Sequence, residues 1–274
     1  MMNIFMRYPG QRTKALTLSY DDGVQQDQRL ISIMRRHGLR GTFNINTGLF
    51  APAEGEKGDR MTREQAINLY RESGMEVAVH TSTHPYLEQL PLSLALREVM
   101  EDRAQIEAMF GGICRGMAYP YGTCSDALAD GLKTCGILYA RTTVSRRDFK
   151  IPDHWLRLSA TCHHNDPKLM ELAEDFAARQ GKAAPLLFYL WGHSYEFDRN
   201  GNWEIIENFA SFLGGREDIW YATNLEIFEY IESYRLLRFS MNGKTVYNPA
   251  AVPLYFCAGG QNITIRPGET ILLP

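Results

Sequence analysis

Two short motifs bring together residue types that could hold a metal ion and activate a water molecule. The first is Tyr20-Asp21-Asp22-Gly23 and the second is His80-Thr81-Ser82-Thr83-His84. Two histidines and one carboxylate form a ligand set that zinc accepts in open catalytic sites, and the second carboxylate remains free as a general base. Adjacent carboxylates repel each other, and a bound cation relieves that repulsion. Together the motifs indicate a metal-dependent hydrolase.

Each motif alone has a simpler interpretation. Asp-Asp-Gly is a common turn composition, and a lone histidine is usually a core or surface residue. Both motifs, however, directly follow strand-like segments, at residues 15–19 and 76–79. Open α/β sheets and α/β barrels place their chemistry at the carboxyl ends of parallel strands. We therefore expect the two motifs to converge at one edge of a sheet.

Two more strand-like segments end in residues that could take part in catalysis. In Tyr119-Pro120-Tyr121-Gly122 the stiff turn could point the Tyr121 amide inward as an oxyanion donor, although a plain hydrophobic turn explains it equally well. His193 could protonate a leaving group, with Trp191 as a wall of the pocket.

Further candidates could contact a substrate. His163 and His164 either line the cleft or belong to a polar loop that caps a helix, and one of them could instead orient the acid. The full set of expected substrate contacts is Trp191, Tyr119, His163 and His164.

Strand-like and helical patterns alternate along most of the chain. Helical segments begin at capping residues such as Thr62 and Ser125. Repeated alternation predicts a parallel sheet covered by helices, and this many units favours a barrel or near-barrel. Strands are expected at 15–19, 41–46, 76–79, 117–119, 137–141, 155–158, 185–191 and 220–222, and helices at 26–37, 62–73, 94–110, 125–135, 165–180, 203–213 and 225–237.

The last segment differs from the rest of the chain. After residue 237, β-branched runs are separated by Asn242-Gly243, Gly259-Gly260 and Pro267-Gly268, which are typical of turns between antiparallel strands. We therefore divide the chain into a catalytic barrel domain, residues 1–237, and a small β tail packed on it, residues 238–274. The tail either covers one end of the barrel or forms an oligomer contact, so homo-oligomerisation stays open.

Composition limits the class of protein. The 274 residues have a net charge of −3, which does not support binding to nucleic acid or to an acidic membrane. The five cysteines show no C-x-x-C spacing and indicate reduced thiols. No segment approaches the roughly 18 apolar residues of a membrane span, and no signal peptide is visible. We expect a cytoplasmic protein.

The order of the four motifs resembles the polysaccharide deacetylase family. Asp-Asp-Gly, His-Thr-Ser-Thr-His, Tyr-Pro-Tyr-Gly and a late strand-end histidine follow one another between about residues 15 and 237. This is the NodB-homology group of carbohydrate esterases, which remove acetyl groups from N-acetylated sugars. The resemblance implies a distorted (β/α) barrel with one divalent ion, usually zinc. The same ligands also accept cobalt, nickel or iron.

The resemblance also implies a role for each motif residue. Asp21 matches the base that activates the attacking water, and the Tyr121 backbone amide matches the oxyanion donor. His193 matches the general acid that protonates the departing amine. The residues that match the metal ligands are Asp22, His80 and His84.

Two departures from the family pattern stand out. The family commonly has an arginine two residues before the proline of its third motif, where it braces the base, and this chain has Ala118 there. Arg115 lies too early to replace it. The motif that supplies an aspartate and a tryptophan near the acid histidine is also blurred, with Asp153 and Trp155 as the candidates.

The leading functional hypothesis is therefore a zinc-dependent deacetylase of N-acetylated sugars. An O-acetyl esterase would use the same site, and so would relatives that hydrolyse small cyclic amides, some of them without metal. A sugar-binding protein that has lost catalysis is the alternative from a different class. With no leader visible, a soluble oligosaccharide, sugar nucleotide or lipid-linked sugar suits the chain better than an intact wall polymer.

Overall fold

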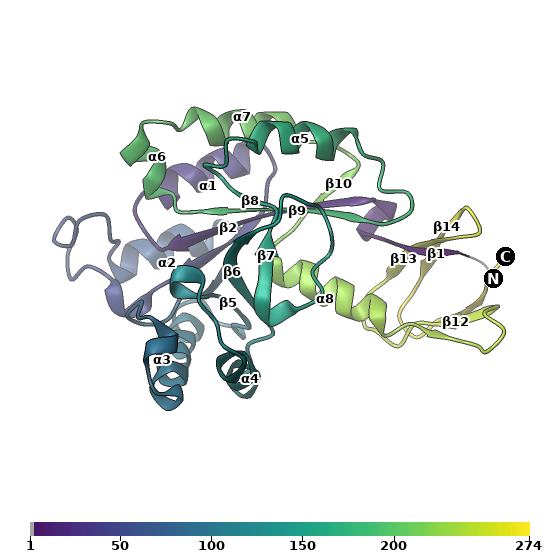
Figure 1. Cartoon of the computed structure of the whole chain (residues 1–274), viewed down its shortest axis with the longest axis horizontal. Coiled ribbons are helices and arrows are strands. Elements are labelled where there is room, and N and C mark those ends of the chain that lie inside the picture. The colour runs from purple at the N-terminus through teal and green to yellow at the C-terminus, as the bar shows by residue number, and fades with distance from the viewer. Residues whose placement is uncertain (1–2) are drawn as a thin grey trace.

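A curved parallel sheet forms the centre of the molecule in the computed structural model, which describes residues 3–274 (Figure 1). Its strand order is β7-β6-β5-β4-β3-β2-β9-β8, and β10 pairs with the start of β2. All these pairings are parallel, as the strand–helix alternation predicts. The strands are β2 (Lys14–Asp22), β3 (Gly41–Ile45), β4 (Glu76–Val79), β5 (Gly116–Ala118), β6 (Tyr139–Ser145), β7 (Leu158–Ala160), β8 (Cys162–His163), β9 (Leu186–Gly192) and β10 (Ile219–Tyr221).

The two ends of this sheet meet in one extended segment. Strands β7 and β8 are separated only by Thr161, yet β7 pairs with β6 and β8 pairs with β9. The Thr161 amide donates to the Tyr189 carbonyl at 2.8 Å, and the Thr161 carbonyl accepts from the Arg147 amide, also at 2.8 Å. The sheet therefore curls into a near-barrel. The strand predicted at 155–158 was wrong, because Trp155–Arg157 forms a 3₁₀ turn and the strand begins at Leu158.

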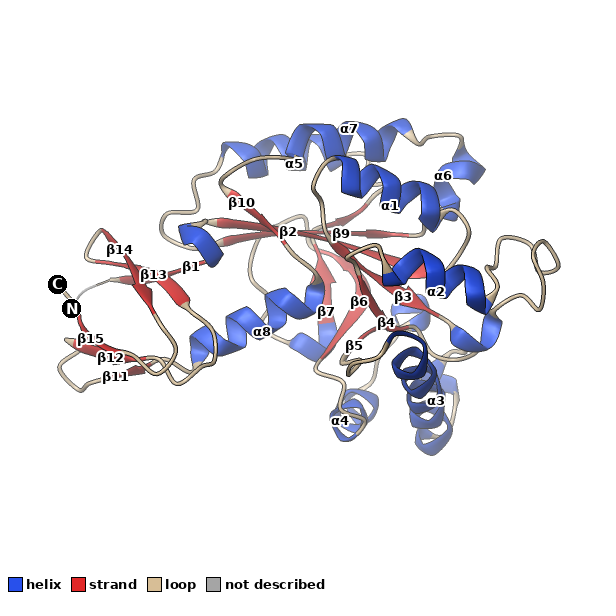
Figure 2. Ribbon diagram, turned by 180° about the vertical axis from the view of Figure 1, so that it is seen from behind, coloured by secondary structure: helices blue, strands red, loops and turns tan. Residues whose placement is uncertain are grey.

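Helices cover the outside of the curved sheet (Figure 2). The predicted cap at Thr62 is confirmed, because its hydroxyl accepts from the Gln65 amide at 3.1 Å while the Gln65 side chain accepts from the Thr62 amide at 2.9 Å. The short helix α6 was not predicted. The helices are α1 (Asp27–Arg36), α2 (Arg63–Arg71), α3 (Leu92–Phe110), α4 (Asp126–Thr134), α5 (Leu169–Ala178), α6 (Tyr195–Asn200), α7 (Glu204–Leu213) and α8 (Asn224–Arg235).

The C-terminal segment forms two small antiparallel sheets beside α8. One contains β13 (Leu254–Ala258), β14 (Gln261–Ile265) and also β1 (Ile4–Arg7), and the other contains β11 (Arg238–Phe239), β12 (Thr245–Tyr247) and β15 (Thr270–Leu272). The N-terminal strand, which the sequence division placed with residues 1–237, thus pairs with the tail. Local patterning could not show this, since the partners lie some 250 residues apart in sequence.

The tail lies at the edge of the sheet opposite the predicted site. Its apolar core includes Tyr230 and Ile231 of α8, together with Ala15 and Leu187 near the starts of β2 and β9. The Tyr230 hydroxyl accepts from the Tyr255 amide at 3.1 Å. The tail therefore covers the amino-terminal ends of the strands and leaves their carboxyl ends open.

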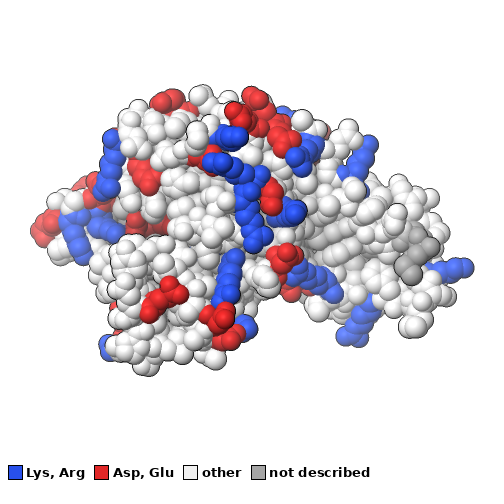
Figure 3. Space-filling model, viewed as in Figure 1, with Lys and Arg blue, Asp and Glu red and all other residues white. Residues whose placement is uncertain are grey.

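The surface and the thiols agree with the composition. Basic and acidic side chains are interspersed over the barrel on the face seen in Figure 3, and the lobe formed by the tail carries few charges. All five cysteines are free thiols, four of them buried. No helix within residues 3–274 has both the length and the apolar character needed to cross a membrane.

Candidate active site

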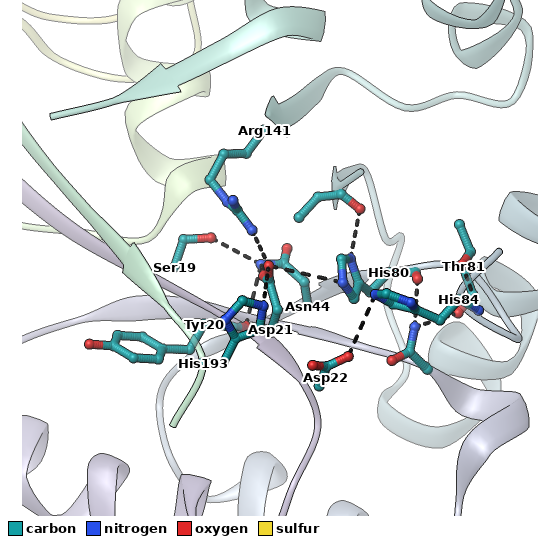
Figure 4. A network of polar contacts seen from close by, with 12 residues as sticks. Ser19, Tyr20, Asp21, Asp22, Asn44, His80, Thr81, His84, Arg141 and His193 are labelled. Carbon is teal, nitrogen blue, oxygen red and sulfur yellow. Dashed lines mark hydrogen bonds and ion pairs between the residues drawn. The ribbon is translucent and has the colours of Figure 1, made fainter. Parts of the chain in front are cut away.

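The three predicted metal ligands lie together at the carboxyl edge of the sheet. Asp22 ends β2, His80 directly follows β4, and His84 lies in the next loop. One ligand atom of each lies within 4.8 Å of those of the other two. The His84 Nε2 is 3.8 Å from the Asp22 Oδ1, and Figure 4 shows these side chains converging. We call these three residues the metal cluster, because their donor types and convergence suit a divalent ion.

The surroundings of His80 prepare one ring nitrogen for a metal. Its Nδ1 lies 2.8 Å from the Ala118 carbonyl, which can only accept, so Nδ1 carries the proton and Nε2 keeps its lone pair. The backbone is fixed as well: Asp102 accepts from the His80 amide at 3.0 Å, and the Asn46 side chain donates to the His80 carbonyl at 2.6 Å. Such outer contacts orient metal-binding imidazoles.

Backbone strain is concentrated around the metal cluster. Four non-glycine residues there have positive φ, namely Asp22 (82°), Thr81 (66°), His84 (58°) and Tyr121 (60°). Such conformations cost about 1–3 kcal/mol each and persist only where neighbouring contacts impose them. At Asp22 the contact is with Arg60, whose guanidinium donates to the Asp22 carbonyl and lies 3.4 Å from its Oδ1. The strain indicates that the fold positions these side chains for a function.

Asp21 is a buried carboxylate held by two donors. Arg141 forms a buried ion pair with its Oδ2, and the Asn44 side chain donates to its Oδ1 at 2.9 Å. Burial alone would raise the pKa of Asp21, but the charge of Arg141, with His80 and His193, lowers it to about 2. Asp21 is therefore ionised at neutral pH and can accept a proton.

The structure explains the missing family arginine. Arg115, already judged too early in the sequence, pairs with Glu229 of α8 at 2.6 Å and does not contact Asp21. Arg141 comes from β6, the strand next to the one that contains Ala118, and its guanidinium also lies 4.5 Å from the centre of the Trp191 ring. The base is thus braced from an adjacent strand, which the motif itself gave no means to predict.

The turn at Tyr121 is held in one conformation. The Gly122 amide donates to the Tyr119 carbonyl at 2.9 Å. Gly122 has φ +73°, and a Cβ there would lie 2.3 Å from the Thr143 Oγ1, so only glycine fits. The Tyr121 ring packs edge-on against His84 at 4.6 Å, which places the turn beside the metal cluster.

His193 faces Asp21 from the end of β9. Its Nε2 is 3.9 Å from the Asp21 Oδ2, while its Nδ1 donates to the Glu196 Oε1 at 3.1 Å. Burial lowers the pKa of His193, but the hydrogen bond to Glu196 and the charges of Asp21 and Asp22 outweigh burial and raise it. Its surroundings therefore favour the protonated form of His193, close to the base and the metal cluster.

Glu196 is the site residue that the sequence reasoning missed. It lies in the first turn of α6, three residues after His193, and that i, i+3 spacing was the only available signal. Its Oε2 lies 2.9 Å from His164 Nε2 and 3.3 Å from His163 Nε2. Burial would raise the pKa of Glu196, but these imidazoles hold it well below its usual range. Glu196 therefore stays ionised next to the Nδ1 of His193.

Two of the four predicted substrate contacts lie beside His193. His163 is partly exposed and packs edge-on against Trp191 at 4.5 Å. Trp191 is mostly buried, with its Nε1 directed toward the Ser145 hydroxyl at 3.4 Å. Both side chains border His193.

The other two predicted substrate contacts are corrected, because their side chains are buried. The Tyr119 hydroxyl donates to the Leu156 carbonyl at 2.9 Å, behind the turn. His164 stacks against the rings of Tyr20 and Phe197. A Cβ at position 192 would lie 2.0 Å from the His164 Nδ1, so Gly192 permits this packing. Both residues support the site from inside the core.

Asp153 and Trp155 lie outside this cluster. The Trp155 indole donates to Glu232 of α8 at 2.6 Å. Both residues line a separate cavity of about 520 Å³ beside α4. The candidates for the blurred aspartate–tryptophan motif therefore do not contact His193, and Glu196 occupies the position of the expected carboxylate.

Comparison with known proteins agrees with this geometry. The sequence profile of the polysaccharide deacetylase family matches residues 9–140, which include three of the four motifs. Residues 9–140 of this chain are therefore similar to the polysaccharide deacetylase family. The three motifs within these residues lie at the carboxyl edge of the parallel sheet.

Solved structures share the fold of this chain. A Mycobacterium smegmatis protein classed as a polysaccharide deacetylase superposes with a TM-score of 0.62 at 16% identity, over 84% of this chain and 93% of its own. A family 4 carbohydrate esterase from Streptomyces lividans, solved with acetate, gives 0.51 at 19% identity over 76% and 91%. A mutant of BA3943, a pseudoenzyme of that esterase family with restored activity, gives 0.51 at 14% identity over 82% and 70%. The fold therefore occurs in active and inactive proteins.

Proposed function

We propose that this protein is a zinc-dependent deacetylase that removes acetyl groups from N-acetylated sugars. One observation carries the proposal: Asp21 lies between the metal cluster and the acid histidine. Its Oδ2 is 4.0 Å from the His80 Nε2 and 3.9 Å from the His193 Nε2. A base, an acid and a set of metal ligands thus surround one point (Figure 4).

The residues at this point have complementary tasks in amide hydrolysis. A divalent ion held by Asp22, His80 and His84 would supply Lewis acidity toward water and the acetyl carbonyl. Asp21, ionised and braced by Arg141, takes a proton as the water oxygen bonds to the carbonyl carbon. The Tyr121 N–H then stabilises the oxyanion of the tetrahedral intermediate.

Collapse of the intermediate breaks the C–N bond. An amine leaves poorly without a proton, and His193 supplies one from its Nε2 while Glu196 holds its Nδ1. The products are acetate and the free amino sugar. Glu196 acts through His193 and is a positioning residue.

The alternative activities differ in what they require of these residues. An alkoxide leaves an O-acetyl ester more readily than an amine leaves an amide, so ester cleavage depends less on His193. The His-Glu contact therefore favours the amide. A protein that binds sugar without catalysis would not need an ionised Asp21 or a His193 whose pKa is raised by Glu196.

The test is acetate release from a panel of N-acetylated sugars and O-acetyl esters, with added zinc or cobalt and a chelated control. We expect metal-dependent release, with an N-acetylated sugar as the best substrate. The Asp21→Asn variant, which keeps the metal ligands, serves as the matched inactive control. Acetate release that survives chelation would overturn the proposed metal dependence. If metal-loaded protein releases acetate from none of the compounds, the proposed deacetylase activity is overturned.

A further inference from the structure

A cavity of about 250 Å³ adjoins the metal cluster. Asp22 belongs to both, so a molecule in the cavity lies within reach of the catalytic edge. Apart from Val24, which follows the Asp-Asp-Gly motif, the remaining walls come from the loop between β3 and α2 and from α6, neither of which contains a family motif. The lining residues are Asp22, Val24, Lys57, Asp59, Arg60, Tyr195 and Arg199.

Three of these side chains are cations. Arg60 is mostly buried and fixed, because it contacts Asp22 and also donates to the Asn46 Oδ1 at 3.2 Å. Lys57 and Arg199 are exposed, and neither forms an ion pair with any of residues 3–274. The Arg199 guanidinium lies 4.2 Å from the centre of the Tyr195 ring, which orients its planar donor face.

The cations outnumber the anions that face them. Asp22 and Asp59 are the two carboxylates in the lining. Asp22 is already shared between Arg60 and His84, and as a metal ligand it would have its charge offset by the ion. Lys57 and Arg199 then face the cavity with Asp59 alone. A neutral sugar offers such a pair no counter-charge, whereas a carboxylate or phosphate offers charge-assisted hydrogen bonds.

We propose that the substrate is an N-acetylated sugar carrying a carboxylate or phosphate, and that Lys57 and Arg199 bind this anionic group beside the metal cluster. The inference rests on the proposed deacetylase activity. It adds a substrate class that the motifs leave open, since none of them contains Lys57 or Arg199.

Binding, measured separately from turnover, tests the substrate class. The probes are N-acetylglucosamine as the neutral sugar, N-acetylmuramic acid for the carboxylate and N-acetylglucosamine 1-phosphate for the phosphate. Calorimetric titration of zinc-loaded Asp21→Asn protein prevents turnover from obscuring the affinities. We expect at least one anionic probe to bind ten or more times more tightly than the neutral sugar, with an advantage that shrinks as salt increases. The anionic probe that binds more tightly shows whether the recognised group is a carboxylate or a phosphate.

A charge-matched pair of variants assigns the effect to the cavity. Adding Lys57→Gln and Arg199→Gln to that protein should remove the anionic preference and leave neutral-sugar affinity within twofold. Arg238→Gln with Lys244→Gln, two exposed cations of the tail, changes net charge equally and should leave the preference intact. Equal affinity for all probes, or a preference that survives the cavity substitutions, overturns the inference. Tight anionic binding without acetate release by the native enzyme would instead overturn the proposed function alone.

Discussion

Two clusters in this protein offer the same kinds of ligand atom and yet differ in their hydrogen-bond partners. The metal cluster consists of Asp22, His80 and His84. The second, which we call the histidine–glutamate cluster, consists of His163, His193 and Glu196. Each offers two imidazoles and one carboxylate whose ligand atoms lie within 4.8 Å of one another. Proximity and residue type alone would make both of them metal sites.

The partner of the second ring nitrogen separates them. In the metal cluster, His80 donates through Nδ1 to a carbonyl, which leaves the Nε2 lone pair free for a cation. In the other cluster, His163 Nδ1 accepts from the Asn165 amide at 3.1 Å, so the ring proton sits on Nε2, toward Glu196. Burial, with the neighbouring His164, lowers the pKa of His163 to about 4, which keeps the ring neutral. The backbone partners therefore leave the Nε2 lone pair of His80 free and place the ring proton of His163 on Nε2, and the proposed metal site and proton transfer use this difference.

The largest expected effect comes from removing a metal-binding imidazole. His80→Ala should abolish high-affinity metal binding and reduce activity to background, because an open zinc site needs all three protein ligands. The matched His163→Ala variant should still bind one metal per chain. Elemental analysis of both proteins after gel filtration is the measurement. Two metals in the native protein and one in His163→Ala would contradict the distinction.

The next largest effect is at the base between the clusters. Asp21→Asn should lower kcat by about 10²–10⁴-fold, the usual contribution of a positioned general base. Its metal content should remain that of the native protein, because Asp21 is not one of the three ligands. Single-turnover acetate release, normalised to bound metal, gives the comparison. Loss of metal in Asp21→Asn would show that Asp21 belongs to the metal cluster.

Replacing Arg141 should affect both stability and the acid limb of the pH profile. The Asp21 pKa of about 2 lies below its ordinary value, so the ion pair stabilises the fold above pH 3.8, and that contribution disappears as pH falls toward 2. In Arg141→Met the unpaired buried carboxylate should cost about 3–5 kcal/mol in urea unfolding of metal-free protein. The activity that depends on ionised Asp21 should also be lost at a higher pH.

A surface arginine provides the control for that experiment. Arg147 pairs with Asp166 at 2.8 Å, and about half of its side chain is exposed. Arg147→Met should therefore change the free energy of unfolding by about 1 kcal/mol or less. Equal losses in the two variants would argue against a special role for the buried pair.

The smallest expected effect is at Glu196. Its charge and hydrogen bond raise the pKa of His193, and an acid must be protonated, so activity falls as pH rises through that pKa. Glu196→Gln should lower this pKa, shift the alkaline limb of kcat to lower pH and reduce kcat about 10–100-fold, as outer-shell changes do. Glu196→Asp, which keeps the negative charge, should return the alkaline limb of kcat part of the way toward its native pH. A lower kcat with an unshifted limb would mean that Glu196 supports the fold without tuning the acid.

Most strands and helices were predictable because their signals are local. Glu76–Val79 is a strand with the predicted bounds, and Ser125 caps α4 by accepting from the Leu128 amide. The strands that were not predicted are those that form only because a distant strand pairs with them. The 162–163 segment is too short to signal a strand by itself and becomes β8 only because β9 is beside it. The N-terminal strand is likewise defined by its partner β13.

The sequence by itself determined which residues meet at the metal cluster. Asp22 ends β2 and His80 directly follows β4, and parallel strands align their carboxyl ends, so local order in the chain was enough to bring them together. Asp21, Tyr121 and His193 also lie at the carboxyl ends of parallel strands, so the same alignment predicted their positions.

Only the tertiary structure decided which neighbours tune these residues. Arg141 is 120 residues away from Asp21 in sequence, and it replaces an arginine that the motif lacks. Glu196 reaches His193 because α6 begins immediately after β9, and the tautomers of His80 and His163 depend on the Ala118 carbonyl and the Asn165 amide. Charges and hydrogen bonds act over a few ångströms, and closure of the sheet brings these groups within that range.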